Sequence, residues 1–406
     1  MNLSPHIANR MLPRKGERHI QPALRISTIS VALGVCVMIW AFAITSGFRK
    51  EIREKVVGFT GYIDIQYFDN NTSYEKQGIC IDSLDFQSID ALPEVTRITS
   101  SVHKAGILQK EEMIEGIFFK GVGPDYPLDF FQKNLVRGEL PSYNDSSTSN
   151  DILLSEAMAI KLRLDTGERI RVYFVQQPVR QRSFHICGIY NTGLNYYDKN
   201  FALCDIRHLQ KLNGWGAGQV DGIEVALRDF EQMESAKNRI NTLLPYNLQA
   251  VTAREQQREL FDWMELFDQN ILVLVILITL VVCITLISTQ LTLVLEQTPN
   301  IGILKTLGSG NRLIRNVFLF ICGKILLKGL LWGNGIALLV CFLQNETHLL
   351  RLNPENYFVD YVPMLCQWQH LLGINLFIWA VTMLVLILPT HHITTRIRTV
   401  EAIRSK

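Results

Sequence analysis

Long uncharged runs alternate with ordinary polar sequence along the chain, and they predict membrane-spanning helices. The predicted spans are 26–48, 269–295, 316–344 and 369–390. Each is long enough, at ~1.5 Å per helical residue, to cross a hydrocarbon core of ~30 Å. Three of them contain no charged residue, whereas the third span along the chain contains Lys324 and Lys328. The pattern therefore predicts a membrane protein with four transmembrane α-helices.

The first span has a second interpretation as a cleaved signal peptide, because Ala41-Phe42-Ala43 resembles a cleavage site. Its apolar stretch exceeds the ~7 to 15 residues of a signal sequence, and a long polar tail precedes it. We therefore favour an uncleaved helix.

Basic residues near the helix ends predict the orientation, because lysine and arginine favour the cytoplasmic side. They gather in three places: Arg10, Arg14, Lys15, Arg18 and Arg25; Lys305, Arg312 and Arg315; Arg396, Arg398, Arg404 and Lys406. Alternate spans put all three groups on one side. We expect cytoplasmic segments at 1–25, 296–315 and 391–406, and extracytoplasmic segments at 49–268 and 345–368.

The large segment 49–268 predicts an α+β extracytoplasmic domain between the first and second spans. Strand patterns occupy 62–67, 97–108, 115–122, 170–175, 184–190 and 222–227. Helix patterns occupy 155–162 and 230–244. A Ser- and Asn-rich stretch at 142–150 suggests a junction between two lobes.

Two helical stalks are predicted at the borders of this domain. A capping box at 252–255 starts a helix that meets no proline or glycine before Pro299. Unbroken to Glu296, it would be ~65 Å long. Apolar stripes follow both stalks, at Leu260, Met264, Phe267 and Ile271 on one and at Ile52, Val56 and Phe59 on the other.

No catalytic or metal-binding pattern is found. The chain has no G-x-x-x-x-G-K-[ST], H-E-x-x-H or G-x-S-x-G motif and no Cys-x-x-Cys pair among its 8 cysteines. We therefore expect no enzyme, no cofactor and no nucleic-acid partner. A Cys187–Cys204 disulfide is one alternative for the outer cysteines, but we favour unpaired thiols.

The segment after the second span predicts a short second helix. Pro299 lacks an amide hydrogen, so it ends the long helix and suits the first turn of a new one. Gly308 suits the end of that helix. Ile301, Leu304 and Leu307 would then form a small apolar face exposed to the cytoplasm. Such a face serves either to dock a protein or to lie on lipid headgroups.

Residues 301–308, Ile-Gly-Ile-Leu-Lys-Thr-Leu-Gly, resemble the cytoplasmic coupling helix of FtsX/MacB/LolE-type permeases of ABC transporters. Further segments resemble the LolC/LolE group of lipoprotein-releasing permeases. They are 7–8 with Arg10, 26–27, 34–35, 46–52, 138–141, 154–159, 162–170, 193–198, 359–363 and 400–404.

This resemblance implies a permease subunit that extracts lipoproteins from a bacterial inner membrane, driven by movement transmitted from a separate ATPase. The implied coupling residues are Glu296, Ile301, Gly302, Ile303, Leu304, Lys305, Leu307 and Gly308. The implied partners are a cytoplasmic ATPase dimer, a second copy or a related permease, and the lipoprotein substrate. The alternatives are a MacB-like efflux permease for peptides or small amphiphiles, and an FtsX-like signalling scaffold that controls a cell-wall hydrolase.

The resemblance also implies a hairpin that captures a periplasmic lipoprotein carrier. The matching place is 175–183, with Gln177, Arg180 and Arg182 as candidate contacts, although it is shorter than the hook of the family. A solvated turn is the alternative. Lys324 and Lys328 form a basic pair on one helix face. They either meet lipid phosphates or a partner within the bundle, or snorkel to the inner interface, which we favour.

Overall fold

The computed structural model describes residue 7 and residues 20–68, 77–81, 84–144, 147–174, 176–353 and 357–396. The chain divides into two units. The helical unit comprises Met1–Arg49, Trp263–Arg351 and Tyr361–Lys406, and the α/β unit comprises Lys50–Asp262 and Leu352–Asp360. The segment Leu352–Asp360, which lies between the third and fourth apolar helices in sequence, therefore belongs to the α/β unit.

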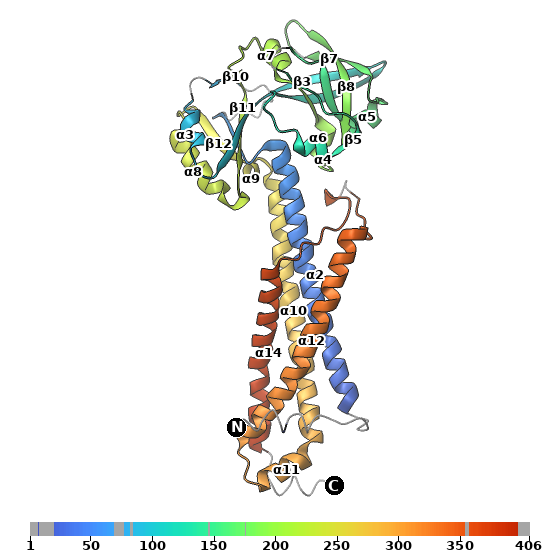
Figure 1. The fold of residues 1–406 in the computed structure, drawn as a ribbon, viewed down its shortest axis with the longest axis vertical. Coiled ribbons are helices and arrows are strands. Elements are labelled where there is room, and N and C mark those ends of the chain that lie inside the picture. The colour runs from blue at the N-terminus through green and yellow to red at the C-terminus, as the bar shows by residue number, and fades with distance from the viewer. Residues whose placement is uncertain are drawn as a thin grey trace. The chain divides into compact units, whose positions relative to one another are not determined.

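The helical unit is built from long helices (Figure 1). They are α2 (Ile20–Thr60), α10 (Arg258–Glu296), α12 (Asn311–Thr347) and α14 (Trp368–Arg396), with the short α11 (Thr298–Thr306) between α10 and α12. Within the described part of the chain, four helices are long and apolar enough, by length and composition, to cross a membrane. Both α2 and α10 continue by sequence into the α/β unit.

Small residues let the helices of this unit pack closely. A Cβ atom on Gly329 would lie 2.5 Å from Val31 Cγ1, and one on Gly333 would lie 2.6 Å from the Ala32 carbonyl oxygen. The spacing of these glycines is the small-xxx-small pattern of close helix pairs in membranes. Between α12 and α14, Asn334 Nδ2 donates to Asn375 Oδ1 at 2.7 Å.

The α/β unit holds a ten-stranded sheet. Its strands are β1 (Ile63–Tyr67), β3 (Val95–Lys110), β4 (Met113–Val122), β5 (Leu135–Gly138), β6 (Asp151–Ser155), β7 (Arg169–Phe174), β8 (Arg180–Tyr190), β9 (Phe201–Asp205), β11 (Gly222–Leu227) and β12 (Leu248–Thr252). A separate antiparallel pair joins β2 (Ile79–Cys80) and β10 (Gln219–Val220).

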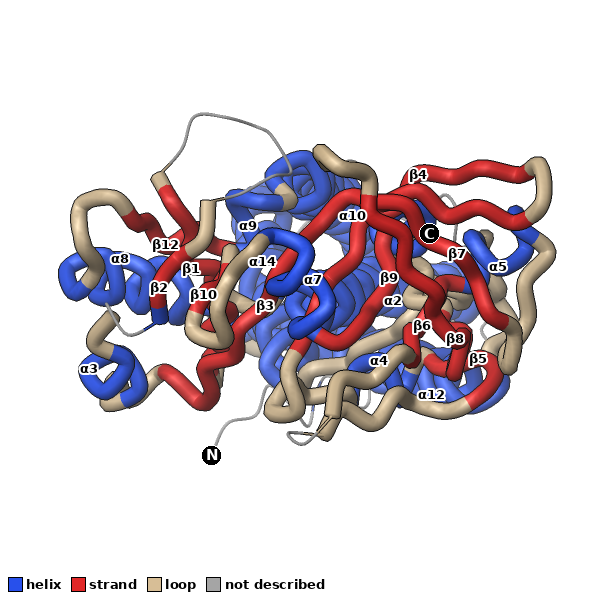
Figure 2. The backbone as a smooth tube through the Cα atoms, turned by 90° about the horizontal axis from the view of Figure 1, so that it is seen from above, coloured by secondary structure: helices blue, strands red, loops and turns tan. Residues whose placement is uncertain are grey.

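The long strand β3 belongs to two halves of the sheet. Its first part pairs with β11, which continues through β1 to β12. Its second part pairs with β4 and β7, and the pairs β4–β9, β9–β6, β6–β8 and β8–β7 close a ring of six strands. Figure 2 shows β1 and β12 gathered at one end and β5, β7 and β8 at the other.

Short helices complete the α/β unit. They are α3 (Phe86–Asp90), α4 (Asp129–Lys133), α5 (Glu156–Leu162), α6 (Asn195–Asn200), α7 (Ile206–Asn213), η2 (Phe230–Gln232), α8 (Met233–Leu243) and α9 (Ala253–Gln256). Helices α3 and α8 lie with the open half of the sheet (Figure 2). An α+β unit was predicted, and the pattern at 222–227 matches β11 residue for residue.

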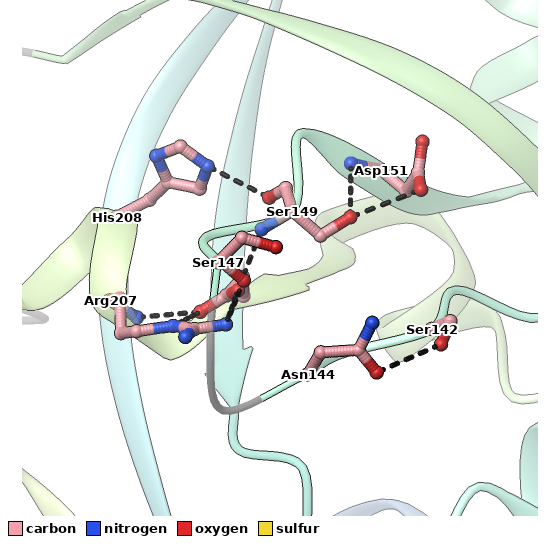
Figure 3. A network of polar contacts seen from close by, with 8 residues as sticks. Ser142, Asn144, Ser147, Ser149, Asp151, Arg207 and His208 are labelled. Carbon is pink, nitrogen blue, oxygen red and sulfur yellow. Dashed lines mark hydrogen bonds and ion pairs between the residues drawn. The ribbon is translucent and has the colours of Figure 1, made fainter.

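The prediction that 142–150 joins two lobes is wrong, because the strands on either side, β5 and β6, both pair with β8. Ser147 and Ser149 of this stretch are instead hydrogen-bonded to the start of α7 (Figure 3). Ser149 N–H donates to Asp205 Oδ2 at 2.9 Å, and Arg207 Nη2 donates to the Ser147 carbonyl at 2.7 Å. Asp205 also caps α7 by accepting from the Arg207 amide.

The predicted unbroken helix from 252 to 296 is also wrong. The Thr252–Glu255 capping box forms, but α9 ends at Gln256 and α10 begins at Arg258. Gln257 between them has φ −115° and ψ 42°, and its side chain donates to the Tyr197 hydroxyl at 2.8 Å. A tertiary hydrogen bond at the break thus accompanies the loss of helical geometry, although the sequence contains no helix breaker there.

The close approach of α2 and α12 predicts that a larger side chain between the two helices will destabilise the protein. We expect Gly333→Val to lower the unfolding free energy by ~1 to 3 kcal/mol, because the new side chain meets the backbone of α2. Gly335→Val is the matched control, since a Cβ at Gly335 meets nothing within 4 Å. Thermal unfolding of the detergent-solubilised chain measures the difference, and equal effects of the two substitutions would contradict this packing.

Candidate functional site

The candidate coupling segment is a well-defined short helix. Helix α10 ends at Glu296, Gln297 makes a turn, and α11 has Pro299 in its first turn, where a missing amide hydrogen costs little. Gly308 has φ +86°, a conformation that glycine adopts readily. Its amide donates to the Lys305 carbonyl at 3.0 Å. The predicted start and end of this helix are confirmed.

The predicted apolar face of this helix is wrong. Ile301 is 0% exposed and belongs to the hydrophobic core of the helical unit, together with Ile314 and Val317 of α12. The exposed apolar side chains are Ile303, at 56%, and Leu307, at 77%. Leu307 lies just beyond the last helical residue and four positions after Ile303, which places the two on one side. The surface these two form is named the Ile303–Leu307 patch.

The other predicted coupling residues differ in how far they are exposed. Gly302 is buried, Leu304 and Lys305 are half-buried, and Glu296 and Gly308 are exposed. The segment therefore offers a small apolar patch held by a buried anchor.

A second site lies within the α/β unit, where the last turn of α2 meets the sheet. Lys120 of β4 is 1% exposed, and its ammonium donates to the Phe59 carbonyl of α2. The same ammonium lies 2.8 Å from Glu224 Oε1 of β11 and 3.0 Å from the Tyr126 hydroxyl. A cation at the carboxyl end of a helix is favoured by the helix dipole. We call this group the Lys120 cluster.

Electrostatics in the Lys120 cluster favour a charged lysine. Burial alone would lower the pKa of Lys120, but the adjacent Glu224 carboxylate raises it above its ordinary value. Burial, reinforced by Glu224, raises the pKa of Tyr126 to about 12. Tyr126 is therefore a neutral hydroxyl at physiological pH, and Lys120 and Glu224 form an ion pair.

Aromatic packing surrounds the same helix end. The Phe59 ring lies 4.2 Å from Tyr197, 5.3 Å from Phe201 and 5.9 Å from Phe131, measured between centroids. Ile52 and Val56, the other members of the predicted stripe, are fully buried. The predicted packing face of α2 beyond the apolar span is confirmed.

One turn earlier, α2 joins two segments that are distant in sequence. Lys55 Nζ donates to the Phe358 carbonyl at 2.9 Å, and a Cβ on Gly193 would lie 2.8 Å from the same nitrogen. The Asp198 carboxylate accepts the amides of Thr192 and Gly193 at 3.2 and 2.9 Å, which fixes this loop. The motif at 193–198 thus lies against Lys55 of α2. Phe358, which accepts the hydrogen bond from Lys55, directly precedes the motif at 359–363.

The predicted carrier-binding hairpin, 175–183, falls on the connection between β7 and β8 and the first residues of β8, and its residue 175 lies outside the described residues. These strands pair up to Phe174 and Arg180. Arg180 Nη1 donates to the Lys211 carbonyl of α7 at 3.2 Å, Gln177 is exposed and Arg182 is half-buried. The structure gives Arg180 a structural partner, and carrier binding here stays a prediction.

Sequence reasoning missed both lysines that hold α2 in the α/β unit. Lys120 stands in the apolar strand Ile117-Phe118-Phe119-Lys120-Gly121-Val122, and a charge in such a run signals a buried, paired group. Lys55 lacks such a signal, because it lies among other charged residues of the stalk. Cys187 and Cys204 are both unpaired, as favoured.

Comparison with known proteins identifies the class. The MacB-like periplasmic core domain matches residues 26–243, and the FtsX-like permease C-terminal domain matches residues 272–396. The first match alone covers more than half of the chain. The chain therefore belongs to the MacB/FtsX-type permeases of ABC transporters, membrane proteins with an extracytoplasmic domain.

Relatives with both parts extend the match over nearly the whole chain. The lipoprotein-releasing system transmembrane protein LolC of Xylella fastidiosa (strain Temecula1) is 25% identical over 401 residues, 93% of this chain and 92% of the relative. LolC of Neisseria meningitidis is 26% identical, covering 83% of each chain. LolE of Haemophilus influenzae is 22% identical, covering 90% of each.

Two solved structures align with part of the chain. The extracellular domain of the noncanonical transporter YknZ matches with a TM-score of 0.34 and 15% identity, over 47% of this chain and 99% of its own. The periplasmic region of MacB from Actinobacillus actinomycetemcomitans matches with a TM-score of 0.36 and 15% identity, over 51% and 95%.

The Lys120 cluster predicts a large effect of removing its cation. We expect Lys120→Met to lower the unfolding free energy by ~3 to 5 kcal/mol, because the Glu224 carboxylate is left buried without a partner. Adding Glu224→Leu should restore most of the loss. Thermal unfolding of the full chain in detergent measures both.

Lys161→Met is the matched control for this prediction. It breaks an exposed pair with Glu115 at 2.7 Å in the same unit, and such pairs contribute ~0 to 1 kcal/mol. Equal losses in Lys120→Met and Lys161→Met would show that the Lys120 cluster carries no special stability.

Proposed function

We propose that the chain is the permease subunit of an ABC transporter that extracts lipoproteins from the bacterial inner membrane. The observation that carries the proposal is the similarity to lipoprotein-releasing permeases over most of this chain and of each relative. The four apolar helices would cross the membrane with both termini in the cytoplasm. Residues 49–268 would then lie outside.

ATP hydrolysis would occur in a separate subunit that docks on α11. The exposed Ile303–Leu307 patch supports this role, because a few side chains that become fully buried in a partner's pockets carry most of the binding energy of an interface. Buried Ile301 would hold the patch against α12, so force on α11 would reach the bundle. The same anchor makes α11 a defined docking surface before the partner arrives.

Movement would then pass along α2 and α10. Helix α2 is continuous over 41 residues, and inside the α/β unit its end is held by the Lys120 cluster. Helix α10 has 39 residues and follows the turn at Gln257, which is bonded to Tyr197. Tyr197 packs on Phe59 of α2, so α2 and the turn that precedes α10 meet the same residue of α6. A shift of either helix would therefore change the contacts of Tyr197.

The complete transporter would contain two permease chains, either two copies or a pair of related chains. Each chain has one α11 and would serve one ATPase of a dimer. A periplasmic carrier that receives the lipoprotein would complete the pathway, with the 175–183 turn as its candidate contact.

Depletion of the chain tests the proposed function. We expect lipoproteins destined for the outer membrane to accumulate in the inner membrane, because their extraction stops. Density-gradient separation of the two membranes followed by immunodetection measures this. Unchanged lipoprotein distribution would exclude the proposal, and a co-purified efflux partner or cell-wall hydrolase would support the corresponding alternative.

The Ile303–Leu307 patch predicts which residues determine ATPase binding. We expect Ile303→Ala with Leu307→Ala to weaken association with the partner ATPase by roughly tenfold or more, since truncated interface anchors typically cost over ~1 kcal/mol each. Thr306→Ala, on the same segment, should have little effect. Affinity of the purified proteins measures the difference, and full binding by the double variant would place the docking surface elsewhere.

A further inference from the structure

A groove between α2 and α12 has one basic and one apolar end. It has a volume of about 810 Å³ and lies entirely within the helical unit. Its lining residues are Leu24, Arg25, Thr28, Ile29, Ala32, Leu33, Cys36, Val37, Trp40, Lys324, Ile325, Lys328, Trp332 and Ile336. Among these described lining residues, the charged ones are all cations.

The cations of the groove gather at one end because the helices run parallel. Gly329 lies against Val31, and Trp40 Nε1 donates to the Ala337 carbonyl at 3.3 Å. This register brings Lys324 to the level of Arg25 and Lys328 to the level of Thr28. From there to Trp40 the remaining lining is apolar, and the pocket therefore has the polarity of an amphiphile with an anionic head.

The dimensions of the groove suit a lipid. From Leu24 to Trp40 the groove extends ~24 Å along α2. The hydrocarbon part of one leaflet is ~15 Å thick, half of the ~30 Å core. The groove is therefore long enough for a headgroup and the acyl chain below it, and its volume is within the ~300 to 1,000 Å³ of ordinary ligand sites.

We propose that this groove binds one anionic phospholipid, with its phosphate near Arg25, Lys324 and Lys328 and an acyl chain along Ala32, Trp332 and Ile336. The basic end is the end at which α2 and α12 begin. Under the orientation in the proposed function, on which this inference rests, it faces the inner leaflet. A lipoprotein taken from the outer leaflet would carry its head at the opposite end.

A second copy of the chain fits the groove less well. Symmetric dimers bring the same surface of both copies together, so groove against groove would place cations against cations. A lipid phosphate instead carries the charge opposite to that of the charged lining residues of the groove, Arg25, Lys324 and Lys328. Charge complementarity therefore favours an anionic lipid over a second copy of the chain as the occupant of the groove.

Native mass spectrometry of the full chain from nanodiscs with equal phosphatidylglycerol and phosphatidylcholine tests the proposal. We expect phosphatidylglycerol to be retained preferentially. Lys324→Gln with Lys328→Gln should reduce this retention roughly tenfold or more, because each basic group near an anionic lipid adds to the attraction. Lys324→Arg with Lys328→Arg should preserve it, which shows that the charge and not the fold is responsible.

Arg312→Gln is the matched control, since it removes an exposed cation from the same helix outside the groove. Equal retention of both lipids, an unchanged double glutamine variant, or an equal loss in Arg312→Gln would overturn the proposal. A photo-crosslinker at Ile29 should capture lipid, and capture of a second copy would overturn it too. Because this readout needs no transport, its failure is distinct from the failure of lipoprotein release.

Discussion

The α/β unit depends on one buried ion pair at the end of a helix. The last carbonyls of α2 have no partner within the helix, and burying them without one would be costly. Lys120 satisfies the Phe59 carbonyl, and Glu224 balances the lysine charge. Because β4 and β11 lie on either side of β3, the pair also joins the closed ring of strands to the open half of the sheet. The Lys120–Glu224 ion pair therefore links the end of α2 and both halves of the sheet.

Tyr197 and its neighbours extend this link to the other elements of the unit. Tyr197 packs against Phe59 and accepts a hydrogen bond from Gln257, just before α10. Asp198 holds the loop at Gly193, whose close approach leaves room for the Lys55 ammonium and its bond to Phe358. Tyr197 of α6 thus contacts both α2 and the turn at Gln257, and Lys55 of α2 reaches the distant segment at Phe358. The resemblance motif at 193–198 has a physical role here, because Gly193 and Tyr197 lie against α2, and Phe358, which directly precedes the motif at 359–363, accepts a hydrogen bond from Lys55.

The sequence predicted what local pattern controls and missed what tertiary contacts decide. Alternation gave β11 with its observed bounds, and the Thr252 capping box formed as expected. The face of α11 was wrong because a helix of two turns has too few residues to define its buried side, and packing on α12 selected Ile301. The break at Gln257 and the place of 142–150 depend on Tyr197 and α7, which no local pattern contains. Lys120 carried a readable signal, a charge within an apolar strand.

The burial of Ile301 bears on how α11 acts. A helix that lies on lipid headgroups needs a broad apolar face along its length. With Ile301 in the core, the large apolar side chains exposed within 296–308 are Ile303 and Leu307, and α11 has only 9 residues. Two side chains give little membrane affinity, whereas a few buried side chains can carry most of the binding energy of a protein interface, and a rigid segment loses less entropy on binding. The packing that removed Ile301 from the surface thus favours protein docking over lipid contact for this helix.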